Sequence, residues 1–221
     1  MGIEQNLREV ERRIARAAQR AGRSPDEVTI VAVTKEVEPE AIEIALKAGI
    51  RHIGENRVQE ARAKIERLST LGLRPIWHMV GHLQTNKVKT AVQIFDIIHS
   101  IDSVRLAQAV SQRAQSTIPV LLQVNVSGEG TKSGFSVAEL AKAAGEIARL
   151  PRLEVKGLMT IAPMVADAEE VRPIFRKLRQ LRDELGLEHL SMGMTDDFEV
   201  AVEEGATMVR IGRAIFKERR K

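Results

Sequence analysis

VTIVAVTKEVEPEAIEIALKAG, residues 28–49, joins a β-branched apolar run to an amphipathic helical pattern. Residues 28–35 predict a buried strand. Residues 39–49 predict the helix that follows it, because proline stands in its first turn and glycine at its end. The same order recurs along the rest of the chain. Short apolar strands that alternate with longer helices are typical of a parallel sheet covered by helices.

Over the whole chain, the sequence predicts eight strand-then-helix units, preceded by an amphipathic helix over 3–21 that has Leu7, Val10 and Ile14 on one face. Eight parallel strands can close into a barrel, so we expect a single (β/α)8 TIM barrel, one domain over 1–221 with an extra N-terminal helix. The alternative is a doubly wound open sheet, which more often has fewer strands and a glycine-rich first turn. The other predicted strands are 52–55, 75–80, 95–101, 119–126, 153–161, 190–194 and 208–212, and the other helices are 57–70, 83–94, 103–116, 136–150, 168–185, 196–204 and 213–218.

Composition excludes several classes of protein. The 221 residues include 43% hydrophobic and 29% charged residues, as in globular domains, and charged residues interrupt every apolar run, so we expect no membrane span. The N-terminus lacks the pattern of a secretory signal, which favours a cytoplasmic location. The absence of cysteine excludes disulfides and thiolate chemistry. The net charge of +4 is dispersed and aromatic residues are few, so no nucleic-acid partner is expected.

Lys35 ends the first predicted strand, directly after Val33 and Thr34. The active site of such a barrel lies at the carboxyl ends of its strands, so this ammonium would lie in the mouth of the barrel. Desolvation there lowers the pKa of an amine and frees it for imine chemistry. The alternative is a lysine whose ammonium simply reaches solvent. Position alone leaves both interpretations open.

The exits of the last two strands form a second candidate site. In this fold they are the recurring phosphate site, because free backbone N–H groups and helix N-termini converge there. Thr195 would add a hydroxyl group, and Gly212 would allow close approach of the backbone. Helix capping by Thr195, with Asp196 and Asp197 complementing the helix dipole, explains the pattern equally well. If an anion binds there, both carboxylates should face outward.

Three other motifs carry weaker signals. His78 and His82 have the spacing of zinc ligands on a helix, but their segment reads as a strand, so no metal site is expected. SGEGTKSG (127–134) departs from a P-loop because a threonine interrupts its Gly-Lys-Ser order, although Lys132 could still reach a bound anion. Asn56, after the second strand, is either a polar group at the rim or a helix N-cap.

Eight blocks of the sequence together resemble the pyridoxal 5′-phosphate homeostasis proteins, the YggS/PROSC family, which is related to the barrel domain of alanine racemase. They follow the same order over nearly the entire chain. Thr195 stands where many relatives have serine and Met79 where an aromatic residue is frequent, and both keep the local chemistry. The blocks are AVTK (32–35), GENRVQE (54–60), WHMVGHLQTNKVK (77–89), HSID (99–102), QVNVSGEGTKSGF (123–135), GLMTIAP (157–163), SMGMTDDFEVAV (191–202) and VRIGRAIF (209–216).

The resemblance implies a cofactor-binding role for nine residues. Lys35 would hold pyridoxal 5′-phosphate as a Schiff base, and Arg210 would face its pyridine nitrogen. A permanently charged guanidinium cannot accept a proton from that nitrogen, so the ring would be a weaker electron sink than with an aspartate there. The phosphate would be surrounded by Met194, Thr195, Gly212 and Arg213, with Asn56 near the ring and its 3′-oxygen and with His78 and Asn125 along the cleft.

The same resemblance implies a protein of vitamin B6 homeostasis that buffers the cofactor or delivers it to apo-enzymes, as a monomer or weak dimer. No catalytic residue is assigned. A low-activity amino-acid racemase is the alternative. In alanine racemase, however, the second base is a tyrosine from a separate domain, for which this chain has no residues left, and the sequence contains no tyrosine. A barrel enzyme that binds another phosphorylated metabolite is a third possibility.

Overall fold

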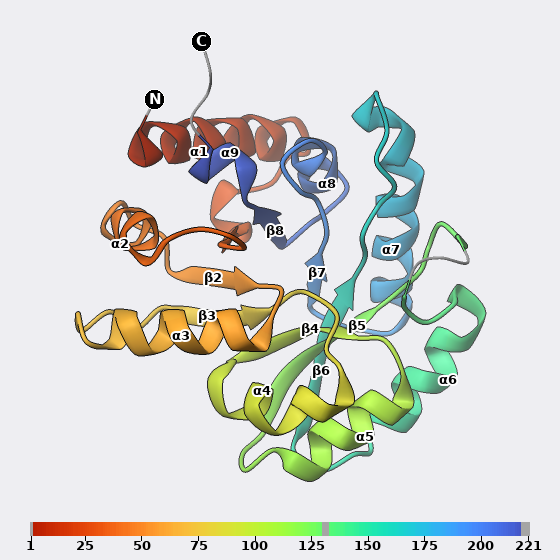
Figure 1. The fold of residues 1–221 in the computed structure, drawn as a ribbon. Helices are drawn as coiled ribbons and strands as arrows, with labels where there is room; N and C mark the ends of the chain where they lie inside the picture. Colours follow the sequence, from red (N-terminus) through yellow and green to blue (C-terminus); the bar gives the residue numbers. More distant parts are fainter. Residues whose placement is uncertain (1, 130–132, 218–221) are drawn as a thin grey trace.

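The computed structural model describes residues 2–129 and 133–217 and shows a closed barrel of parallel strands (Figure 1). The strands follow one another around the barrel in sequence order, and β8 pairs with β1 to close it. Closure confirms the predicted TIM barrel and excludes the open doubly wound sheet. The strands are β1 (Thr29–Val33), β2 (His52–Glu55), β3 (Ile76–Met79), β4 (Ile97–Ile101), β5 (Ile118–Gln123), β6 (Leu153–Met159), β7 (His189–Ser191) and β8 (Met208–Ile211).

Helices follow the strands and cover the outside of the barrel (Figure 1). They are α2 (Pro39–Lys47), α3 (Val58–Ser69), α4 (Val88–Ile94), α5 (Val104–Arg113), α6 (Val137–Ile147), α7 (Arg172–Glu184), α8 (Phe198–Glu203) and α9 (Arg213–Phe216). Ser136 and Glu139 form a capping box at the start of α6, where the sequence predicts a helix over 136–150.

Two predicted helices begin later than the periodicity suggests. The segment expected as one helix over 83–94 starts with the 3₁₀ turn η2 (Thr85–Lys87), and α7 is preceded by η3 (Ala168–Val171). Thr85 and Asn86 favour local turns over the helix interior, which explains the first difference. At η3, Asp167 accepts from the amide of Glu169 and closes a capping box with Glu170.

The extra N-terminal helix, α1 (Ile3–Arg20), packs against α8 and α9 (Figure 1). Its predicted apolar face is buried. Arg13 lies 4.5 Å from the centre of the Phe198 ring and pairs with Glu199 at 2.7 Å, and Asn6 donates to the carbonyl oxygen of Ile215 at 3.0 Å. The helix therefore fixes α8 and α9, the two helices that follow β7 and β8.

Inside the barrel a small apolar cluster of Val31, Val80, Leu121, Met159 and Met208 is separate from the main core between strands and helices. Buried polar side chains share this interior with the cluster, among them those of His78, His99 and Ser191. Within the described ranges, no helix is both long enough and apolar enough to cross a bilayer.

Candidate functional site

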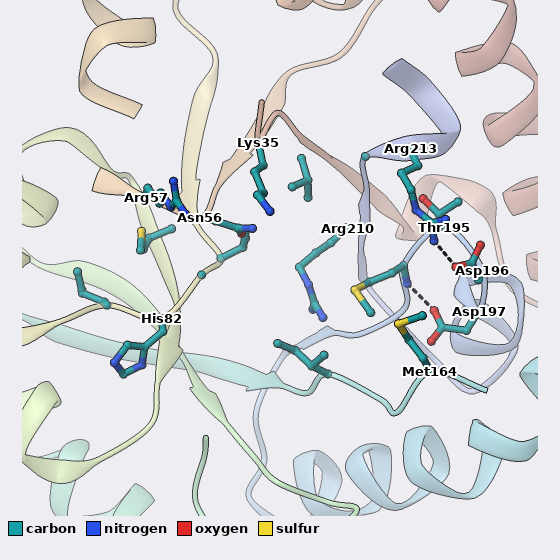
Figure 2. Close-up of a pocket in the computed structure, with 18 of the residues that line it drawn as sticks. Lys35, Asn56, Arg57, His82, Met164, Thr195, Asp196, Asp197, Arg210 and Arg213 are labelled. Carbon is teal, nitrogen blue, oxygen red and sulfur yellow. Dashed lines mark hydrogen bonds and ion pairs between the residues drawn. The ribbon is translucent and has the colours of Figure 1, made fainter. Parts of the chain in front are cut away.

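A cavity of about 960 Å³ opens at the carboxyl ends of the strands (Figure 2). Its lining includes seven of the nine residues that the sequence analysis gives as cofactor-binding candidates. They come from the exits of β1, β2, β7 and β8: Lys35, Asn56, Met194, Thr195, Arg210, Gly212 and Arg213.

A tight turn at the exit of β1 presents Lys35. The amide of Val37 donates to the carbonyl oxygen of Thr34 at 3.0 Å, and Glu36 in the turn has a φ of 58°. This pattern is that of a type II turn, which normally takes glycine at the position of Glu36, so the turn carries backbone strain. Figure 2 shows the Lys35 side chain directed into the cavity between Asn56 and Arg210.

The amine of Lys35 is accessible rather than enclosed. Its side chain is 45% exposed, and Nζ lies 3.6 Å from Oε1 of Glu36. The sequence left open whether desolvation activates this amine or its ammonium reaches solvent, and a side chain exposed to this extent is not desolvated. The strand is too short to bury the side chain, because β1 ends at Val33 and Lys35 lies in the turn beyond it.

A buried ionic cluster holds the Thr34 end of this turn. Nζ of Lys64, on α3, donates to the Thr34 carbonyl at 2.6 Å and to Oε1 of Glu55 at 2.7 Å, and the Thr34 hydroxyl donates to the same carboxylate oxygen. Glu55 is fully buried. Thr34 directly precedes Lys35 and Glu55 directly precedes Asn56, so the cluster fixes two rim positions together. Sequence reasoning missed it, because Lys64 reads as one more charged residue of an amphipathic helix.

Arg210, on β8, forms part of the floor of the cavity. Its Nη1 donates to the carbonyl and the hydroxyl of Ser191 at 2.8 and 2.7 Å, and its Nη2 donates to the carbonyl of Thr160 at 2.8 Å. Burial lowers the pKa of Arg210 to about 10, and the carboxylate of Asp197 opposes this shift. The guanidinium therefore keeps its charge at neutral pH.

The exits of β7 and β8 meet on one side of the cavity. The Thr195 hydroxyl accepts from the amide of Ala214 at 3.4 Å, so it links the loop after β7 to the first turn of α9. In α9 the amides of Ile215 and Phe216 donate to the Gly212 carbonyl, so the amides that need a partner outside the helix are those at its start, at Gly212 and Arg213, and Arg213 adds a cation there. A side chain at position 212 would place its Cβ 3.1 Å from the Val33 carbonyl, so glycine allows the β8 exit to lie against that of β1.

The two carboxylates of this region have different positions. Asp196 is exposed and pairs with Arg213, whereas Asp197 is buried and its Oδ1 accepts from the Met194 amide at 2.6 Å. The expectation that both face outward is therefore wrong for Asp197. Burial raises the pKa of Asp197. The Met194 amide is already engaged, which leaves Thr195, Arg213 and the start of α9 as the donors of this region.

The other sequence candidates differ in position, and two of the cofactor-binding candidates, His78 and Asn125, lie outside the cavity lining. His78 is fully buried inside the barrel and does not line the cavity, and Asn125 lies in the loop after β5, where its Nδ2 donates to the Glu129 carbonyl at 2.8 Å. Lys132 is outside the described residues. His82 lines the cavity and pairs with Asp102 at 3.1 Å, so it has different surroundings from His78.

The loop after β6 contributes an apolar lip that sequence reasoning did not single out. Ile161, Met164 and Val165 line the cavity with exposed side chains. Ile161 ends the predicted strand 153–161 and the other two residues follow it, which is the only signal for them in the sequence.

Comparisons with known proteins agree over the full length. The family model described as alanine racemase, N-terminal domain, matches residues 5–220. A pyridoxal phosphate homeostasis protein of Aquifex aeolicus is 46% identical over 98% of this chain and 98% of its own length. One from Escherichia coli K12 is 42% identical over 98% and 97%.

Solved structures also resemble this chain over nearly its whole length. PipY of Synechococcus elongatus PCC7942, solved with PLP bound, has a TM-score of 0.85 and 35% identity over 97% of this chain and all of its own. An alanine racemase from Corynebacterium glutamicum has a TM-score of 0.70 at 20% identity, and this chain covers 60% of it. The racemase shares the barrel fold.

Proposed function

The chain belongs to the alanine racemase N-terminal domain family, among the pyridoxal phosphate homeostasis proteins, and on that premise we propose that it binds pyridoxal 5′-phosphate, with Lys35 as the attachment point, for vitamin B6 homeostasis. One observation carries the proposal: the amine of Lys35 lines the same cavity as the hydrogen-bond donors Thr195 and Arg213, which follow β7 and β8. Strands β1 and β8 are neighbours in the barrel, so their exits lie side by side.

The residues present fit this cofactor chemically. An aldehyde needs an accessible amine, which Lys35 supplies, and a phosphate needs N–H and O–H donors with positive charge, which Thr195, Arg213 and the first turn of α9 supply. The cofactor, when bound, supplies an aldehyde that condenses with an amine with loss of water, and a pyridine ring that withdraws electrons. Asn56 adds an amide group beside Lys35 in the same cavity.

Arg210 and the exposure of Lys35 favour holding and release over catalysis. Arg210 keeps its proton and can only donate, so it cannot stabilise a protonated pyridine nitrogen and keeps the ring a weak electron sink. Because Lys35 is half-exposed, water or another amine can reach the attachment and reverse it. We therefore propose buffering and delivery to apo-enzymes, in the cytosol, as the biological role.

A transfer experiment tests this role. The chain is loaded with pyridoxal 5′-phosphate, freed of unbound cofactor by gel filtration, and mixed with the apo form of an enzyme that needs the cofactor. Activity should return in proportion to the loaded protein added. Lys35→Ala protein should lose the cofactor on the column and restore little activity, whereas Lys47→Ala, at an exposed lysine of α2, should behave as wild type.

Two results would contradict the proposal. One is a Lys35→Ala protein that carries and transfers the cofactor as well as wild type. The other is sustained, protein-dependent exchange of the α-hydrogen of alanine for solvent deuterium, which would assign catalysis to the site instead.

A further inference from the structure

A column of hydrogen-bonded side chains crosses the inside of the barrel. Nδ1 of His52, at the start of β2, lies 2.9 Å from Nε2 of His78, and Nδ1 of His78 lies 2.8 Å from Nε2 of His99. Nδ1 of His99 lies 2.8 Å from the Ser191 hydroxyl, which accepts from Arg210. The column thus connects half-buried His52, near the amino ends of the strands, to Arg210 in the cavity.

The donor and acceptor roles along the column follow from its cavity end. A guanidinium can only donate, so the Ser191 oxygen accepts from Arg210, and its own proton then needs an acceptor, because a buried hydroxyl without one is costly. Nδ1 of His99 is that acceptor. A neutral imidazole that accepts on one nitrogen donates on the other, so Nε2 of His99 donates to His78, and Nε2 of His78 donates to His52.

The surroundings keep the imidazoles neutral. Burial is the main cause that lowers the pKa of His78 to about 3, and the nearby His52 is the second cause. Burial also lowers the pKa of His99, and His78, Arg210 and His189 add to the shift. At His52 burial lowers the pKa, and Asp96 opposes it.

We propose that Ser191, His99, His78 and His52 act as positioning residues that hold Arg210 at the cavity floor through one directional column, in which all three imidazoles carry their proton on Nε2. The opposite direction would give the Ser191 oxygen two donors, Arg210 and His99, and would leave its own buried proton without an acceptor.

Nitrogen NMR of the ligand-free full-length chain, labelled with ¹⁵N, tests the proposal independently of any cofactor. The sequence has five histidines, so the three of the column can be compared with His82 and His189 in one spectrum. Near neutral pH all three column rings should be protonated on Nε2.

Two variants of Ser191 separate positioning from simple packing. Ser191→Ala removes the donor to His99, so the His99 and His78 signals should shift to a tautomer mixture, and hydrogen exchange of the Arg210 guanidinium should accelerate about tenfold, as expected for loss of one charged hydrogen bond. Ser191→Thr keeps the hydroxyl and should restore the wild-type spectrum. A wild-type spectrum with the proton on Nδ1 of His78 or His99, or tautomers and exchange unchanged in Ser191→Ala, would overturn the proposal.

Discussion

Replacement of Lys64 by methionine should destabilise the protein by about 3–5 kcal/mol, the usual cost of removing one partner from a buried ion pair. Methionine has nearly the same shape, so the cost comes from the charge and not from a cavity. Glu55 is fully buried and its second oxygen, Oε2, has no hydrogen-bond partner in the described part of the chain, so only the Thr34 hydroxyl would remain to stabilise the carboxylate.

Equilibrium unfolding in urea at neutral pH measures this loss, with two controls. Lys47→Met breaks an exposed pair with Glu43 on α2 and should change the free energy of unfolding by no more than about 0.5 kcal/mol. The double variant Lys64→Met/Glu55→Gln removes both charges and should recover more than half of the loss, because no unpaired carboxylate remains. A Lys64→Met protein within about 1 kcal/mol of wild type, or a double variant no more stable than the single one, would show that the buried Glu55 carboxylate does not depend on Lys64.

Three further predictions concern the same rim. Glu36→Gly should raise the free energy of unfolding by up to about 1 kcal/mol because it relieves the positive φ, and an unchanged urea midpoint would count against strain in the turn. Gly81→Ala should be destabilising, since its Cβ would lie 2.4 Å from the Asn56 carbonyl oxygen, whereas Gly145→Ala, inside α6 with open space around it, should stabilise by about 0.5–1 kcal/mol; equal effects in urea unfolding would contradict the packing described. Asp197→Asn should be more stable than wild type at neutral pH. Burial raises the pKa of Asp197 in the folded protein, so folding favours the protonated acid. This stabilisation is fully present below the pKa of Asp197 in the unfolded chain and is lost as pH rises through its pKa in the folded protein. The difference in stability between the two proteins should therefore vanish in acid.

Local sequence patterns were sufficient to predict the architecture. The alternation that starts at residues 28–49 continues around the barrel, and the exits of β1, β7 and β8 bring Lys35, Thr195 and Gly212 to one cavity. These predictions hold because chain order dictates neighbours in a barrel: the first and last strands must pair for it to close.

Properties that depend on register and on side-chain direction could not be predicted. His52, His78 and His99 meet only because three adjacent strands align them inside the barrel, and nothing in the local pattern around each one indicates it. Asp197 reads as an exposed residue at a helix start, but the tight loop after β7 turns it inward to the Met194 amide. The exposure of Lys35 likewise depends on where β1 ends.

The proposed function assigns the attachment of pyridoxal 5′-phosphate to one amine, that of Lys35. Reduction of the loaded protein with borohydride, followed by peptide mapping by mass spectrometry, identifies the lysine that carries the cofactor. A single reduced adduct is expected on the peptide that contains Lys35, and none in the Lys35→Ala protein. A principal adduct on any other lysine, or an equal yield of adduct without Lys35, would contradict this assignment.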